Sequence, residues 1–342
     1  MSSKKIPGRL RRRAVTVPAM FTSAGLYVVS APLLVPVLAL ADLIGGIRRR
    51  RFLRAWAFAG AYLYREVVGL TTLGLLWVLS GFGLAMGRRR FQNAHHALQR
   101  WWVGGLARAM IRIFGMDLRV SGTEQALPAP AIVIARHISL GDALMPTFLV
   151  AVPHRIALLH TFKQDLAWDP CLDLVGHRAP HHFVDRSPRD RESELAPIRE
   201  LGGHADHETS IAIFPEGTFR TPERFERAIA RLGDSDPAAA EAARKLEYLL
   251  PPRPAGTFAL MQGAPDADLV ILGHTGFEPF SSLPRTWRNI PFRSPVHARL
   301  WRIPRAEVPE DPGEFARYLL DVWLEMDRWI GERRREDDGA PR

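Results

Sequence analysis

The sequence has 342 residues but a single cysteine, Cys171, and only four of its 46 basic residues are lysine. One cysteine cannot form an internal disulfide and has no second thiol with which to build a zinc or redox pair. These absences exclude a disulfide scaffold, and a reducing compartment is expected. The net charge is +10, with 47% hydrophobic and 24% charged residues, which is typical of a globular protein.

Formal charge is also missing from two long segments near the N-terminus. Residues 14–41 include no Asp, Glu, Lys or Arg, and neither do residues 67–87. A bilayer core about 30 Å thick is crossed by roughly 20 helical residues, so both segments are long enough to span it. Pro32 and Pro36 are expected to kink the first segment. Arginines flank the two segments at Arg9 with residues 11–13, at residues 48–51 and at residues 88–90.

These arginine clusters leave the membrane topology open. Two simple spans would place residues 48–51 opposite the other clusters, against the preference of Lys and Arg for the cytoplasmic side. If each segment instead enters one leaflet and returns, all three clusters meet the same anionic surface, at about 1 kcal/mol per charge. We favour this one-sided arrangement and expect residues 1–90 to be a membrane-anchoring helical region. The alternatives are two core helices of a soluble protein and a signal peptide cleaved near Ala41, which the long apolar run and the second segment disfavour.

From residue 91 onward the pattern is that of an α/β domain. Aliphatic runs predict strands at residues 117–120, 131–135, 155–159, 210–214, 268–272 and 297–303. Longer stretches predict helices at residues 98–114, 223–250 and 314–330. Strands that alternate with helices predict a mixed, mostly parallel sheet flanked by helices over residues 91–331. Residues 332–342 are expected to be a flexible tail.

His137 follows the predicted strand 131–135, and Asp142 comes five residues later. On one continuous helix their side chains would be about 140° apart, so they meet only if the chain turns and a helix begins near Ser139. A carboxylate in contact with an imidazole fixes its tautomer and stabilises the cation formed on protonation. The pair is therefore a candidate general base with its orienting group. Ser139 and Asp142 also have capping-box spacing, so a purely structural role for Asp142 is the alternative.

The second candidate is the turn Pro215-Glu216-Gly217-Thr218, which follows the predicted strand 210–214 and precedes Arg220. A strand that runs into a glycine turn leaves backbone N–H groups, a carboxylate and a guanidinium at one sheet edge. Such an edge suits a phosphate or a developing oxyanion. An ordinary turn with solvated charges is the alternative.

Other motifs indicate function less strongly. His160 and Asp165 repeat the spacing of His137 and Asp142. Five further histidines have no Cys cluster or His-Glu-x-x-His helix beside them, so no metal site is expected; they are His177, His181, His182, His204 and His207. No Gly-x-Ser-x-Gly elbow is present, so no serine nucleophile is expected. The arginine runs bracket apolar segments, which is typical of a lipid surface, and no nucleic-acid partner is expected.

Both candidate motifs occur in the order and spacing of the glycerolipid acyltransferase superfamily, the lysophosphatidic acid acyltransferases, and the chain resembles this family over roughly residues 95–330. His137 and Asp142 match its His-x-x-x-x-Asp block, which implies a general base and an orienting carboxylate. Residues 183–186 match the second block, whose arginine, here Arg186, is implied to bind the acceptor's phosphate. Residues 214–218 match the third block, which implies that the substrate is held by Glu216, Gly217 and Thr218.

Further positions extend the resemblance, and two depart from it. Lys163 stands where the family often has a lysine, residues 122–124 resemble its Gly-x-Glu turn, and residues 248–258 resemble the Pro-Arg-x-x-Gly-Phe stretch of the longer, membrane-bound members. The family usually has Asn where this chain has Arg136. It also has Arg directly after Thr, where this chain has Phe219 followed by Arg220. Across this shift of one residue, the resemblance implies that Arg220 binds the phosphate.

The resemblance implies the glycerolipid acyltransferase fold and a membrane-bound O-acyltransferase. Such an enzyme moves a fatty acyl group from acyl-CoA or acyl-carrier protein to the free hydroxyl of a lysophospholipid, most simply lysophosphatidic acid, and makes phosphatidic acid. No cofactor is expected beyond this acyl thioester donor. The expected partner is the lipid bilayer, with the catalytic domain on the cytoplasmic face of a bacterial inner membrane. The alternatives are a different lyso- or glycolipid acceptor and an inactive membrane-anchored scaffold, in which Arg136 and the shifted Arg220 would mark lost activity.

Overall fold

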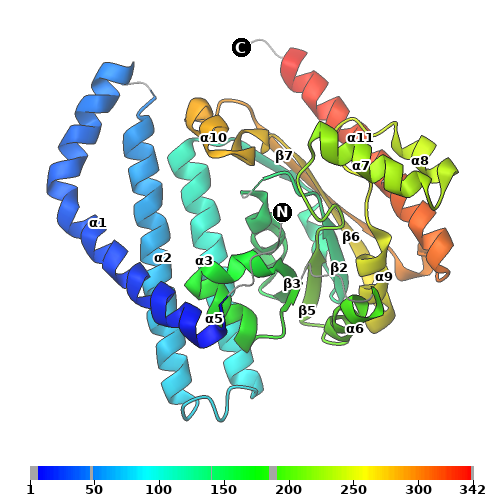
Figure 1. The fold of residues 1–342 in the computed structure, drawn as a ribbon, viewed down its shortest axis with the longest axis horizontal. Coiled ribbons are helices and arrows are strands. Elements are labelled where there is room, and N and C mark those ends of the chain that lie inside the picture. The colour runs from blue at the N-terminus through cyan, green and yellow to red at the C-terminus, as the bar shows by residue number, and fades with distance from the viewer. Residues whose placement is uncertain (1–6, 47–48, 140, 185–190, 340–342) are drawn as a thin grey trace.

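The computed structural model describes residues 7–46, 49–139, 141–184 and 191–339. Figure 1 shows a hairpin of two long helices beside a twisted sheet, with helices on both faces of that sheet. The N-terminal helices are α1 (Arg9–Gly46), α2 (Arg51–Leu79) and α3 (Arg89–Phe114). The remaining α-helices are α4 (Val152–His154), α5 (Pro170–Arg178), α6 (Arg191–Gly202), α7 (Pro222–Gly233), α8 (Pro237–Ala243), α9 (Pro254–Gly263), α10 (Leu283–Asn289) and α11 (Pro312–Gly339).

The sheet has seven strands in the order β1-β7-β6-β2-β5-β3-β4. Their bounds are β1 (Leu118–Ser121), β2 (Ala131–Ala135), β3 (Ala157–Lys163), β4 (His182–Val184), β5 (Thr209–Ile213), β6 (Asp268–Thr275) and β7 (Val296–Ile303). Every neighbouring pair is parallel except β6 with β7, so β1 and β7 run opposite to the other five strands. The predicted mixed, mostly parallel sheet flanked by helices is confirmed. The sequence analysis missed β4, a short strand at the sheet edge.

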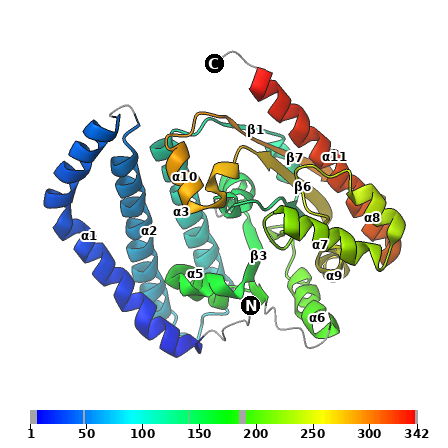
Figure 2. The same cartoon turned by 45° about the horizontal axis from the view of Figure 1, so that its top comes forward.

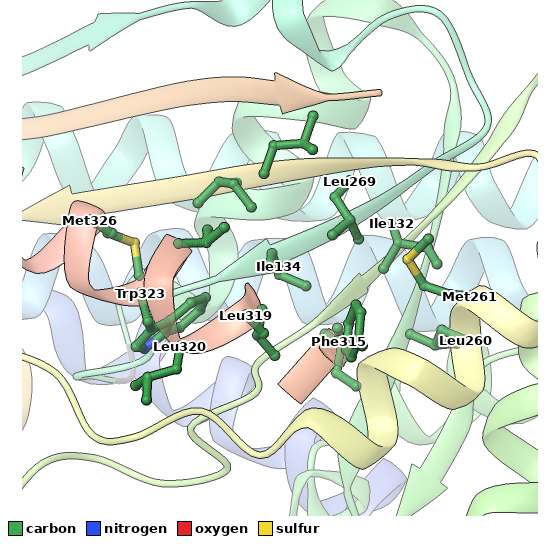
Figure 3. Close-up of a cluster of buried hydrophobic side chains, with 14 of the residues drawn as sticks. Ile132, Ile134, Leu260, Met261, Leu269, Phe315, Leu319, Leu320, Trp323 and Met326 are labelled. Atoms are coloured by element: carbon green, nitrogen blue, oxygen red, sulfur yellow. The ribbon is translucent and has the colours of Figure 1, made fainter. Parts of the chain in front are cut away.

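Alternation along β2 divides the core into two layers. Ile132 and Ile134 pack on one face, while Ala131, Val133 and Ala135 pack on the other. Figure 3 shows Ile132 and Ile134 against side chains of α9 and α11, including Trp323. Because β2 lies between β5 and β6 and is buried on both faces, its carboxyl end is a rigid base for whatever follows it.

One expected element differs from the structure. The predicted helix 223–250 is wrong, because the chain forms two helices there, α7 and α8. Each begins with a proline at its first position, and each has its own N-cap, Thr221 or Asp236, whose side chain accepts a backbone N–H bond. Within the expected tail, α11 continues over residues 332–339, and Arg334 lies 3.3 Å from the Glu278 carboxylate. Residues 340–342 lie outside the described residues.

The second apolar segment, residues 67–87, does not form one helix. Its first part belongs to α2, which begins at Arg51, and the chain then turns through three residues with positive φ, Gly81, Phe82 and Gly83. The hairpin closes at the other end of α2, where the Asp42 carboxylate accepts hydrogen bonds from the backbone N–H groups of Phe52 and Leu53, at 3.1 and 3.0 Å. Helices α1 and α2 are both long and apolar enough to cross a membrane, judged by length and composition.

Both ends of the hairpin are bound to the α/β domain. At the start of α1, Arg12 and Arg13 form ion pairs with the buried Asp173 of α5. Burial opposes ionisation of Asp173, but hydrogen bonds from His177, Arg13 and Arg12 outweigh it and lower its pKa to about 2. At the start of α2, the Arg51 guanidinium donates to the backbone carbonyls of Arg288 and Ile290, at 2.9 and 3.2 Å.

The middle of α2 is bound to the domain as well. The buried Glu66 accepts a 2.8 Å hydrogen bond from the Trp102 indole of α3, and the Arg65 guanidinium lies 4.1 Å from the centre of the Trp101 ring. The hairpin therefore runs along the flank of the domain instead of projecting from it. Figure 2 shows α1, α2 and α3 on one side of the sheet and α11 on the other.

Candidate active site

The candidate site lies where β2, β5 and β6 end. His137 comes two residues after β2, Glu216 three residues after β5, and His274 is next to last in β6. Because the three strands are parallel neighbours, their carboxyl ends meet at one edge of the sheet. The sequence motifs that are far apart in the chain are therefore brought together here.

The His137 imidazole and the Asp142 carboxylate are in contact. Nδ1 of His137 lies 3.1 Å from Oδ1 of Asp142, and both side chains are buried. A carboxylate oxygen only accepts hydrogen bonds, so the contact requires the imidazole proton on Nδ1. Nε2 is then left with its lone pair, which is the atom a general base uses.

Asp142 is held by its own backbone surroundings. Its Oδ2 atom accepts hydrogen bonds from the backbone N–H groups of Ile138 and Ser139, at 2.6 and 3.0 Å, and its N–H donates to Oγ of Ser139. This reciprocal pairing is the capping pattern that the spacing indicated. Capping and contact with His137 thus coexist, because each uses a different carboxylate oxygen.

One peptide unit, between Arg136 and His137, is bound from both sides. Its carbonyl accepts a hydrogen bond from Nε2 of His274, at 3.1 Å, and its N–H donates to Oε1 of Glu216, at 3.0 Å. The strand ladder around β2 ends one residue earlier, where the Arg136 N–H donates to the Leu272 carbonyl. Side chains from the two neighbouring strands therefore continue the pairing and fix the backbone from which His137 projects. We call this contact the peptide clamp.

Arg136 points away from the dyad and into the protein. Its side chain is only 1% exposed and donates to the backbone carbonyls of His274 and Tyr248, at 2.6 and 3.2 Å. It also lies 3.4 Å from the Glu278 carboxylate, which Arg334 approaches from α11. Burial alone would raise the pKa of Glu278, but the Arg136 guanidinium lowers it below its usual value. Arg136 is thus a buried structural cation at the position where the family usually has Asn.

Glu216 is also buried, at 2% exposed, and both of its oxygens bind backbone. Oε1 belongs to the peptide clamp, and Oε2 accepts the Leu250 N–H at 3.0 Å. Burial raises the pKa of Glu216 to about 7, against the opposing effect of these donors and of Arg136. Gly217 follows with φ +66°, which permits the tight turn in which its N–H donates to the Phe214 carbonyl. Thr218 is half-buried in the same turn.

Two aromatic rings lie against His137. The centres of the Phe214 and Phe219 rings are each 4.6 Å from the centre of the imidazole. Nζ of Lys163, at the end of β3, lies 5.3 Å from the centre of the Phe219 ring. The predicted Lys163 is therefore beside the site, because the same Phe219 ring contacts both it and His137.

One predicted arginine, Arg220, is not brought to His137. Nε of Arg220 donates to the Leu249 carbonyl at 3.2 Å, and its guanidinium lies 4.7 Å from the centre of the Phe225 ring. Arg220 is thus directed toward α7 instead of the dyad. Arg186 lies outside the described residues.

The second histidine–aspartate match has different contacts. Nε2 of His160 lies 2.8 Å from Oγ1 of Thr147, and its ring stacks on Phe162. Burial lowers the pKa of His160 to about 4, so the ring is neutral near pH 7. Within the part of the chain that the structure describes, no group of three or more His, Cys, Asp or Glu side chains could hold a metal ion.

An apolar cavity of about 150 Å³ opens beside Asp142. It lies between α3, α5 and β3, and its wall includes Leu98, Trp102, Leu144, Phe162, Leu166 and Val175. Since Leu144 is two residues after Asp142, the cavity adjoins the dyad. A wider groove of about 680 Å³, lined by Trp301, Trp329 and Arg299, shares no residue with the site.

The sequence analysis missed His274 and the buried partners of Arg136. It placed Arg253 in the Pro-Arg-x-x-Gly-Phe stretch but gave it no role in the site; its N–H donates to the Pro215 carbonyl at 2.9 Å. A signal for His274 was present, because it comes two residues after the predicted strand 268–272, as His137 comes two residues after the predicted strand 131–135. Its hydrogen bond to the Arg136 carbonyl depends on β6 lying next to β2, which no local pattern encodes.

Comparison with known proteins gives two similarities. Residues 117–270 match the family model described as Acyltransferase. The chain also resembles the crystal structure of the 1-acyl-sn-glycerophosphate (LPA) acyltransferase PlsC from Thermotoga maritima, with 15% identity, 78% of this chain and 98% of that chain covered, and a TM-score of 0.45. No curated protein matches the sequence. The family match supports an acyltransferase domain at residues 117–270, where both candidate motifs lie.

We predict that Glu216→Gln removes one part of the pH dependence of stability. The pKa of Glu216 is about 7 in the folded protein and about 4.5 in the unfolded chain, so only the folded state holds this proton between those values. The free energy of unfolding should therefore fall as pH rises from 4.5 to 7, by up to about 3 kcal/mol, and glutamine lacks this contribution. Urea unfolding in mild detergent across this range measures it. Equal pH dependence in wild type and variant would contradict the prediction.

Proposed function

We propose, from the acyltransferase domain that residues 117–270 match, that this protein is a membrane-bound enzyme that acylates the free hydroxyl of a lysophospholipid. The acceptor we infer is lysophosphatidic acid, and the product is phosphatidic acid. The donor is a fatty acyl thioester of CoA or of acyl-carrier protein, and no cofactor takes part. The observation that carries this proposal is the contact between His137 and Asp142 at a sheet edge shared with the Pro-Glu-Gly-Thr turn.

The proton transfer follows from the tautomer of His137, whose Nε2 atom has a free lone pair. Nε2 of His137 takes the proton of the acceptor hydroxyl as the hydroxyl oxygen attacks the thioester carbonyl. The carbon–sulfur bond breaks, and the proton passes from the imidazolium to the departing thiolate. Asp142 stabilises the imidazolium in between. A thioester is already activated, so no covalent enzyme intermediate is needed.

The contacts of Arg136 argue against the inactive scaffold. Its guanidinium binds the backbone carbonyls of His274 and Tyr248 and lies beside the Glu278 carboxylate. The contact of His137 with Asp142 forms although Arg136 replaces the usual Asn. The other departure bears on the acceptor instead, since Phe219 contacts His137 where a guanidinium was expected. A different lyso- or glycolipid acceptor is therefore the second candidate.

The cavity beside Asp142 suits the acyl chain of the donor. Its wall is apolar and begins two residues after the dyad, so a chain inserted there would leave its thioester carbonyl near His137. The buried pair of Thr147 and His160 is satisfied internally and leaves the wall without charge.

The hairpin contacts favour attachment to one face of a bilayer. Arg12 and Arg13 at one end of α1 and Arg51 past its other end all contact the same domain. Two helices that crossed the bilayer would separate these ends by about 30 Å of hydrocarbon, and the domain would have to cross with them. Exposed apolar side chains line α1 and the turn after α2, including Leu33, Val37, Phe82 and Leu84. We infer that this surface lies in one leaflet, with the catalytic domain on the cytoplasmic side of a bacterial inner membrane.

We predict that His137→Ala lowers acyl transfer by roughly 10²–10⁴-fold, because general-base catalysis contributes about that much. The assay follows radiolabelled acyl-CoA and lysophosphatidic acid with purified protein in detergent, across a panel of lysolipid acceptors. His204→Ala is the matched control, since His204 is exposed and outside the site. Near-normal turnover by His137→Ala would overturn the assignment. Absence of transfer by wild type to every acceptor would favour the scaffold.

We predict that Val175→Phe shifts the donor preference toward shorter chains. Val175 is buried in the cavity wall, so a larger ring there removes space that a long chain needs. The ratio of kcat/KM for a C16 to a C10 acyl-CoA should fall roughly tenfold or more. Val175→Ala enlarges the cavity and is the control that should not lower the ratio. An equal loss with both donors in the phenylalanine variant would place the acyl chain elsewhere.

We predict that both ends of α1 stay on one side of a membrane. A Cβ atom added at Gly8, Gly25 or Gly45 meets nothing within 4 Å, so cysteine is tolerated at each position, and the native Cys171 is buried. Protein bound to preformed anionic liposomes is treated with an impermeant maleimide. Gly8→Cys and Gly45→Cys should react at once, and Gly25→Cys only after detergent is added. Protection of one end alone would indicate a spanning helix, and reaction of all three would show that α1 lies outside the bilayer.

A further inference from the structure

The turn after β5 lacks the arginine that the family pattern places next to Thr218. Phe219 occupies that position, and its ring packs on His137. The arginine one residue later, Arg220, is directed toward the Leu249 carbonyl and the Phe225 ring. Arg186, which the resemblance implies for the acceptor's phosphate, lies outside the described residues, so a guanidinium within the described part of the chain must come from another segment.

The segment before α9 places a guanidinium on this turn. Three atoms of the Arg253 guanidinium, Nη1, Cζ and Nε, lie 3.5, 3.6 and 3.8 Å from the position a Cβ of Gly217 would take. The group therefore lies over the glycine, where any side chain would contact it. Arg253 itself is exposed, so one side of it faces solvent.

Backbone hydrogen bonds fix the position of Arg253 relative to the turn and to His137. Its N–H donates to the Pro215 carbonyl at 2.9 Å, and the Leu250 N–H donates to the Glu216 carboxylate at 3.0 Å. The other oxygen of the same carboxylate accepts the His137 N–H. Pro252 and Pro254 flank Arg253 and restrict its backbone. The Arg253 segment, the turn and His137 are thus tied together through one buried carboxylate.

We infer that Arg253 binds the phosphate of the acceptor and does so in place of the arginine that the family has after Thr218. This inference rests on the proposed function. A guanidinium presents a planar pair of donors to a phosphate and remains charged at all relevant pH. Lys163, beyond the Phe219 ring, adds a second positive charge at the site. Arg253 therefore determines which acceptors are used, while His137 performs the proton transfer.

Steady-state kinetics of Arg253→Gln in detergent test the inference. The KM for lysophosphatidic acid should rise about ten- to a hundredfold, as expected for loss of a charged hydrogen bond, with kcat nearly unchanged. The KM for acyl-CoA should not change, although CoA also has phosphates, and neither should the KM for a monoacylglycerol, which has none. Arg253→Lys should recover part of the loss. Arg244→Gln, which removes an exposed arginine of the α8 end, is the control for net charge.

A binding measurement separates this inference from the proposed function. Submicellar lysophosphatidic acid should raise the Tm of wild type and of His137→Ala, but should raise that of Arg253→Gln far less. A rise in the KM for acyl-CoA in Arg253→Gln would assign the cation to the donor and overturn the inference. So would a rise in the acceptor KM in Arg220→Gln with none in Arg253→Gln. Acceptor binding that depends on Arg253 without any transfer by wild type would instead refute the proposed function alone.

Discussion

The clamp on the peptide unit between Arg136 and His137 is the contact on which the candidate site depends. A parallel ladder stops where its strands stop, and His137 lies just beyond that point. His274 and Glu216 extend the ladder with side chains in place of backbone. Because β5 and β6 flank β2 on both sides, the direction in which His137 leaves the sheet is set by the rigid core and not by a surface loop. The contact of His137 with Asp142 follows from that direction.

This arrangement buries several acids close together and needs a buried cation. Asp142, Glu216 and Glu278 are all largely removed from water, and an uncompensated carboxylate there would be costly. The Arg136 guanidinium pairs with Glu278 and favours the charged form of Glu216. Arg334 extends the network into α11 and connects the C-terminal part of this helix to the residues behind His137. A longer side chain than asparagine is needed to reach these partners from position 136.

The hairpin and the site are joined through the same domain. Asp173 of α5 binds the start of α1, and Val175 of the same helix lines the cavity beside Asp142. The surface proposed to meet lipid and the cavity proposed to hold an acyl chain are therefore separated by one short helix. In the proposed function, a substrate that enters from the leaflet does not have to cross bulk water to reach His137.

The sequence by itself determined what local pattern can encode. Short runs of aliphatic residues predicted the central strands, and uncharged runs predicted the apolar N-terminal region. The His-x-x-x-x-Asp and Pro-Glu-Gly-Thr motifs identified residues that the fold then brought together. The tertiary structure alone decided the contacts of His274, Arg136 and Arg253. Each of these residues binds a segment that is distant in sequence and is brought near by the strand order or by the packing of a loop. It also decided that the Arg220 side chain binds the Leu249 carbonyl and does not face His137, since a shift of one residue beyond a strand changes which side of the turn a side chain faces. Contacts between segments a hundred residues apart depend on which strands are neighbours, and neighbours in a sheet are chosen by the whole core.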